Sequence, residues 1–160
     1  MMNSIYVIDA SALILLSQHY PKEVFSSLWG SIEDLIKAKN VLAPHQVFKE
    51  IEQGGDEILT KWCKANTRMF LNNTPDVIKL MQEIIQKHPT LVNPYATRET
   101  ADPFLIALAR SLKSNVSNSK PIIVTDENNA KIDRIPQVSK TYGLESVKLT
   151  GMFQSERWTF

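Results

Sequence analysis

The sequence predicts a three-layer α/β/α fold with a mainly parallel central sheet and helices on both faces. Short apolar runs at residues 5–8, 41–43 and 121–125 are typical of strands buried on both faces, and helical patterns separate them. Strands that alternate with helices pair in parallel through right-handed crossovers. The stretch 104–109 contains no polar residue, so we expect the helix that includes it to be buried against the middle of the sheet.

The composition is that of an ordinary globular chain, and we expect one domain over residues 1–160. With 160 residues, 43% of them hydrophobic and 22% charged, the chain can bury a sizeable core. The formal net charge of +1 is lower than that of a typical nonspecific nucleic-acid binder, so composition leaves the function open. No segment resembles a membrane span or a secretory signal, and the single cysteine, Cys63, excludes an intramolecular disulfide. We therefore expect a cytoplasmic protein with Cys63 in its core.

The remaining elements follow from local signals. In the N-terminal third we expect a strand over 5–8, helices over 12–17 and 21–39, a strand over 41–43 and a helix over 45–53. Ser11 is expected to cap the first of these helices, and Pro44 opens the last. In the middle of the chain we expect helices over 56–70 and 74–88 that form a helical flank over 56–88, followed by a loop over 89–99. A helix from 102 to about 112 and a surface connection over 114–119 come next. The remaining elements are a strand over 121–125, a helix over 135–142, a strand over 147–149 and an aromatic-rich tail over 152–160.

Carboxylates stand at the points where these elements begin or end. Asp9 and Asp126 follow two strands, Asp102 begins the apolar helix, and Glu50 lies beside the apolar stripe of its helix. In a parallel sheet, the carboxyl ends of strands and the helix starts that follow share one rim, so these groups can converge. Taken singly, Asp102 is explained as a helix N-cap and Glu50 as a solvated helix residue.

Convergence of four carboxylates has a chemical consequence. The charges would repel one another and raise one another's pKa unless a cation neutralised them. Oxygen ligands favour hard ions, so the expected cofactor is Mg²⁺ or Mn²⁺. Such an ion binds phosphate oxygens and activates water for an in-line displacement.

Four segments together resemble a known family. They are Tyr-Val-Ile-Asp9-Ala-Ser11, Glu50 in the helix after Pro44, Ala-Asp102-Pro-Phe-Leu-Ile-Ala-Leu-Ala and Ile-Val-Thr125-Asp126. This order resembles the PIN-domain ribonucleases, and most closely the small bacterial and archaeal toxins of toxin–antitoxin pairs.

The resemblance implies a PIN-like fold and a metal-dependent endoribonuclease that acts on RNA. It implies that Asp9, Glu50, Asp102 and Asp126 hold the ion and are catalytic. It also implies that the hydroxyls of Ser11 and Thr125 lie near the site, and that Glu127 or Asn128 can share or replace the role of Asp126. The partners it implies are a cognate antitoxin and a second copy in a homodimer. The helical stretch over 56–88 is longer than in the smallest toxins, so their antitoxin contacts do not transfer directly.

Three other functions are considered. A PIN-like module without catalysis would serve only in binding, although all four acids are present. A metal-dependent phosphatase of the haloacid dehalogenase type also begins with a strand that ends in Asp, but it needs a second acid two residues later. Ser11 stands at that position, which disfavours this function. A zinc site is disfavoured because the three histidines lie far apart in the sequence. Candidate contacts to flanking phosphates are Lys49, Arg98 and Lys131, although each is also explained as a solvated surface residue.

Overall fold

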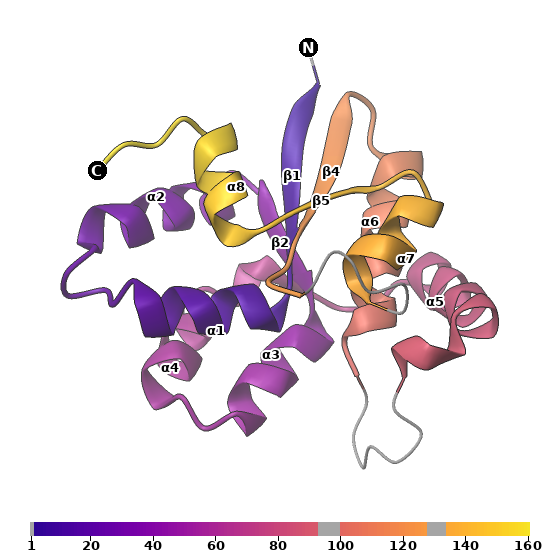
Figure 1. The fold of residues 1–160 in the computed structure, drawn as a ribbon, viewed down its shortest axis with the longest axis horizontal. Coiled ribbons are helices and arrows are strands. Elements are labelled where there is room, and N and C mark those ends of the chain that lie inside the picture. The colour runs from indigo at the N-terminus through magenta and orange to yellow at the C-terminus, as the bar shows by residue number, and fades with distance from the viewer. Residues whose placement is uncertain (1, 93–99, 128–133) are drawn as a thin grey trace.

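The computed structural model describes residues 2–92, 100–127 and 134–160, and the strands in them form a parallel sheet. The strands are β1 (Asn3–Ile8), β2 (Val41–Pro44), β3 (Phe70–Leu71), β4 (Ser119–Val124) and β5 (Glu145–Val147). Their order in the sheet is β3-β2-β1-β4-β5 (Figure 1). The predicted α/β class with a parallel central sheet is confirmed.

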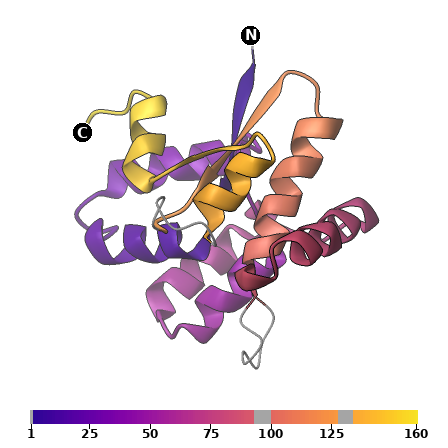
Figure 2. The ribbon, with the colours of Figure 1, turned by 45° about the vertical axis from the view of Figure 1, so that its right-hand side comes forward.

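Helices cover both faces of this sheet (Figures 1 and 2). One layer contains α1 (Ala10–His19), α2 (Ser26–Lys37), α3 (His45–Gln53) and α4 (Glu57–Ala65). The other contains α5 (Pro75–Lys87), α6 (Asp102–Asn115) and α7 (Ile135–Thr141). From β1, the chain adds β2 and β3 on one side of the sheet and β4 and β5 on the other. Because the crossovers are right-handed, the two groups of connecting helices lie on opposite faces of the sheet. The short helices η1 (Thr67–Met69) and η2 (Pro89–Leu91) and the C-terminal α8 (Leu149–Ser155) complete the described elements.

The direction of strand addition reverses between β1 and β4, at the centre of the sheet. These two strands pair over their whole length, with Ile8 opposite Val124, and the Asp9 N–H donates to the Val124 carbonyl oxygen at 2.9 Å. Residues that follow β1 and β4 therefore meet at one edge. In open parallel sheets, this is the place where ligands bind.

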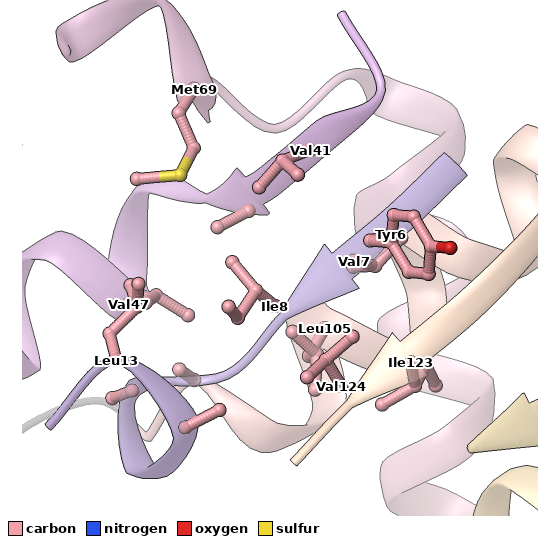
Figure 3. Packing of buried hydrophobic residues seen from close by; sticks show 14 of the residues in the cluster. Tyr6, Val7, Ile8, Leu13, Val41, Val47, Met69, Leu105, Ile123 and Val124 are labelled. Atoms are coloured by element: carbon pink, nitrogen blue, oxygen red, sulfur yellow. The ribbon is translucent and has the colours of Figure 1, made fainter. Parts of the chain in front are cut away.

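Helix α6 is buried in the way its sequence predicts. Leu105, Ile106, Ala107 and Ala109 are 0% exposed, and Figure 3 shows Leu105 beside Val124 of β4. Burial of a leucine side chain contributes about 1.5–3 kcal/mol. The apolar contacts between α6 and the sheet thus hold the helix start at the carboxyl edge.

Several expected boundaries are wrong. Asp9, not Ser11, caps α1, because its Oδ1 accepts from the Ala10 N–H at 2.7 Å. Helix α2 begins only at Ser26, because the chain after Pro21 forms a turn in which the Val24 and Phe25 N–H groups bond to the Pro21 carbonyl.

The expected helical flank over 56–88 is divided by a strand. Helix α4 ends at Ala65, and η1 and β3 follow it before α5 begins. β3 pairs with the end of β2, so pairing outweighs the local helical pattern and places α4 and α5 on opposite faces. Towards the C-terminus, β5 covers Glu145–Val147 and the expected tail begins as α8.

Two expectations drawn from the composition can be compared with the structure. Cys63 is 0% exposed in the core, and burial raises the pKa of its thiol to about 12. Among the described helices, none combines the length and the apolar character that crossing a membrane requires.

We predict that Leu105→Ala lowers the free energy of unfolding by about 2–5 kcal/mol, because truncation removes buried contacts and leaves a cavity in the core. Urea unfolding at constant pH measures this. Ile58→Ala is the matched control, since Ile58 is 73% exposed and its truncation should change stability by less than about 0.5 kcal/mol. Similar losses for both variants would contradict the central position of α6.

Candidate metal centre

Three carboxylates from separate segments meet at the carboxyl edge of the sheet. Asp9 follows β1, Asp102 is the first residue of α6, and Glu127 lies in the loop after β4. One oxygen of each lies within 4.8 Å of the oxygens of the other two. The edge where strand addition reverses thus carries a compact acidic cluster, hereafter the carboxylate cluster of Asp9, Asp102 and Glu127.

Asp9 is the most constrained member of this cluster. It is 3% exposed, and its Oδ1 accepts the Ala10 N–H at 2.7 Å. Its Oδ2 accepts from the Ser11 and Thr125 hydroxyls, each at 2.9 Å. These hydrogen bonds stabilise the charged form of Asp9 and hold its carboxylate in one orientation.

The hydroxyls of Ser11 and Thr125 connect Asp9 to the loop after β4. Besides donating to Asp9, Ser11 Oγ accepts from the Asp126 N–H at 3.0 Å. Thr125 Oγ1 likewise accepts from the Glu127 N–H at 3.2 Å. Both hydroxyls therefore position carboxylates, and both lie close to the cluster.

Glu127, rather than Asp126, is the acid after β4 that joins the cluster. Side chains of an extended chain alternate in direction, and Thr125 points to Asp9. Asp126 then points away, is 39% exposed and lies 3.7 Å from the Lys148 Nζ. Glu127 turns back, and its Oε2 accepts the N–H of Ile135, the first residue of α7, at 2.9 Å. The expected convergence of Asp126 with the other acids is not found.

Glu50 fixes the start of α6 and stands next to the cluster. Its Oε1 accepts the Ala101 N–H at 2.7 Å, directly before Asp102 in the chain. It is not one of the three grouped carboxylates, although its charge acts on both Asp9 and Asp102. The solvated position considered for Glu50 is therefore wrong.

Asp102 does not cap its helix. Ala101 occupies the N-cap position with φ −79° and ψ −22°, and no side-chain hydrogen bond caps α6. Asp102 is already inside the first turn, where its charge meets the positive end of the helix dipole. Capping thus explains Asp9 but not Asp102.

Burial and like charges raise the pKa of Asp102 to about 9. Desolvation is the largest cause, followed by the charges of Asp9 and Glu127, and the charge of Arg134 opposes them only in part. Asp102 therefore favours its protonated form at neutral pH in the absence of a cation.

The pKa of Asp9 is raised less, to about 6. Desolvation again is the largest cause, and the hydrogen bonds from Ser11 and Thr125 act against it. The cluster thus combines a carboxylate that its donors keep largely ionised with one that takes up a proton.

The donor set fits a hard divalent cation. All its ligand atoms are carboxylate oxygens, which suit Mg²⁺ and Mn²⁺. Oxygens bound to one Mg²⁺ at about 2.1 Å lie roughly 3.0 Å apart when adjacent and 4.2 Å when opposite. The three oxygens of the cluster lie within 4.8 Å of one another, a separation of the same order as this spacing.

The other residues considered from sequence lie differently. Lys49 is on α3, next to Glu50 in the chain, whereas Arg98, Asn128 and Lys131 lie outside the described residues. Arg134 and Lys148 were not expected near the acids, and only the fold brings them there.

Comparison with known protein families gives a match that covers nearly the whole chain. By its fold and its site, the chain is a three-layer α/β protein with an acidic cluster at the carboxyl edge of its sheet. Residues 6–160 match the profile of the family described as "Domain of unknown function (DUF4411)". The chain belongs to that family. No curated protein matches the sequence.

We predict that the metal-free protein loses stability as pH rises from 6 to 8. Asp102 keeps its proton in the folded state up to a pKa of about 9, whereas an unfolded aspartate ionises near pH 4. The folded state therefore binds more protons in this window, and the unfolding free energy falls by up to about 1.4 kcal/mol per pH unit. Urea unfolding in excess chelator at pH 6, 7 and 8 measures this slope.

Two variants test whether Asp102 causes this dependence of the unfolding free energy on pH. Asp102→Asn should reduce it and be more stable than the wild type at pH 8, because a buried asparagine is neutral without the proton that the folded wild type must take up. Asp126→Asn is the matched control, with the same change of charge at a side chain outside the cluster, and should keep the wild-type slope. Equal slopes in the wild type and in Asp102→Asn would show that Asp102 is not the titrating group.

Proposed function

We propose that the protein is a Mg²⁺- or Mn²⁺-dependent endoribonuclease of the PIN-domain type and the toxin of a toxin–antitoxin pair. The observation that carries this proposal is the convergence of Asp9, Asp102 and Glu127 within 4.8 Å at the carboxyl edge of a parallel sheet. The resemblance of four sequence segments to PIN-domain toxins supplies the substrate class, RNA.

The residues at this edge have different proposed roles. Asp9, Asp102 and Glu127 would hold the ion, with Glu50 beside them. When bound, the ion supplies positive charge that attracts a phosphodiester oxygen, and it activates a water for attack on phosphorus. Ser11 and Thr125 orient Asp9 through their hydroxyl hydrogen bonds.

Charge explains why RNA binding at the cluster requires the cation. The whole chain carries a formal net charge of only +1, so an RNA phosphate meets a locally negative edge. Asp102 would have to give up its proton to hold the cation, because metal ligands must be deprotonated. The proposal therefore includes loss of both RNA binding at the cluster and cleavage in chelator.

The proposed partners follow from the resemblance to toxins. A free enzyme that cuts cellular RNA is harmful to its host, so the proposal includes a cognate antitoxin protein in the cytoplasm. It also includes a homodimer. Expression of the wild-type chain alone should slow growth, and Asp9→Ala should relieve this effect.

We predict cleavage of RNA by the wild type in Mg²⁺ or Mn²⁺ and none in excess chelator. Asp9→Asn, Asp102→Asn and Glu127→Gln should each lower the rate by more than about 100-fold, because each removes a charged ligand. Asp126→Asn should stay within a few-fold of the wild type. The assay follows a panel of structured and single-stranded RNAs by gel electrophoresis.

The outcomes separate the alternatives. Cleavage that persists in chelator, or in all three cluster variants, would show that the cluster is not the active site. A wild-type protein that binds Mn²⁺ but cuts no RNA of the panel would favour the binding module. Loss of activity in Asp126→Asn but not in Glu127→Gln would assign the role after β4 to Asp126.

A further inference from the structure

A groove leads away from the carboxylate cluster between α7 and β5. These two elements lie side by side at the edge of the sheet (Figures 1 and 2). A small hollow of about 40 Å³ begins at Glu127, and a larger one of about 330 Å³ follows it. Pro136 and Ser146 line both hollows, so the two are neighbours. The remaining lining residues are Thr125, Glu127, Val147 and Lys148 in the small hollow, and Gln137, Lys140, Leu144 and Glu145 in the large one.

Two exposed lysines line the groove beyond the carboxylate cluster. Lys148 stands at its head with 53% of its side chain exposed, and Lys140 lies exposed on the wall of the larger hollow. Glu145, the acid in that hollow, forms an ion pair with Lys120, whose Nζ lies 2.8 Å from its carboxylate. Exposed Arg134, directly before α7, adds positive charge near the cluster.

Lys148 keeps capacity for a further contact. Its Nζ lies 3.7 Å from the Asp126 carboxylate and donates to the Asp126 carbonyl oxygen at 3.2 Å. An ammonium group has three N–H donors, and the exposed side chain leaves it access to solvent. A phosphate at the head of the groove can therefore reach Lys148 without breaking its contact with Asp126.

We propose that this groove binds the phosphate backbone of the RNA strand that flanks the cleaved bond, with Lys148 and Lys140 as the phosphate contacts. This inference rests on the proposed function, because it takes the carboxylate cluster as the cleavage site. The described lining contains no aromatic side chain on which a base could stack, and its two lysines are suited to phosphate contacts. Recognition through the groove is therefore salt-dependent and independent of sequence.

The experiment compares Lys140→Gln/Lys148→Gln with Lys37→Gln/Lys64→Gln, which loses the same charge from exposed positions on α2 and α4, across the sheet from α7. Cleavage of a single-stranded RNA of about 12 nucleotides is followed at 50–200 mM salt. The groove variant should raise KM about tenfold at the lowest salt and leave kcat unchanged. The salt slope of log kcat/KM should fall by about 1.4, or about 0.7 for each lost phosphate contact. The control variant should match the wild type.

Further variants separate loss of charge from damage to the fold. Lys140→Arg/Lys148→Arg keeps both charges and should restore KM. Lys140→Gln alone should give part of the effect without touching the contact with Asp126. A KM that stays high in the arginine variant would overturn the proposal, because altered packing rather than lost charge would then explain the rise in KM.

Binding of the same RNA to Asp102→Asn protein distinguishes the groove from the nuclease. If the wild type cleaves RNA and the groove variant matches the control, the groove proposal fails and the function stands. If the wild type cleaves no RNA while the two lysine substitutions weaken binding about tenfold, the function fails and the groove stands as an RNA site. If neither cleavage nor RNA binding is found, both the groove proposal and the proposed function fail. A protein partner is then the remaining candidate ligand of this edge.

Discussion

The burial of negative charge at the carboxyl edge of the sheet is the constraint on which the rest of this structure depends. Asp9 and Asp102 stand where the apolar core ends, and desolvation opposes the ionisation of both. Each pKa unit of such a shift corresponds to about 1.4 kcal/mol between the two protonation states. Apolar packing alone gives no reason to bring Glu127 within 4.8 Å of them. A proton on Asp102 relieves this repulsion at neutral pH, and the proposed cation would turn it into attraction.

The same carboxylates also join elements that are distant in the sequence. Asp9 binds the loop after β4 through Thr125, Glu50 binds the start of α6, and Glu127 binds the start of α7. Hydrogen bonds to charged acceptors contribute about 1.5–3 kcal/mol each. Polar contacts thus set the relative positions of these segments at the edge, whereas apolar contacts set them in the core. The geometry of the carboxylate cluster and the folding of this edge are therefore coupled.

Sequence patterns predicted the parts of the fold that local chemistry determines. Pro44 and a glycine pair bracket α3, whose predicted bounds are those observed. The two residues of β3 carry no pattern of their own and pair only because the fold brings them to β2. The choice between Asp126 and Glu127 depends on which of the two side chains turns inward after β4. Because the two acids are adjacent in the sequence, the sequence alone does not show this. The fold brings Arg134 near Asp102 and Lys148 to Asp126, and the positions of these two residues in the sequence do not predict either approach.

A calorimetric titration of the protein with Mn²⁺ at pH 7 tests the central claim most directly. The account predicts saturable binding by the wild type with release of protons, because Asp102 carries a proton until the cation displaces it. Buffers with different ionisation enthalpies measure that release. Asp126→Asn should bind in the same way as the wild type, and Asp102→Asn should bind at least about tenfold more weakly. Absence of binding by the wild type, or equal affinities in the wild type and Asp102→Asn, would contradict the account.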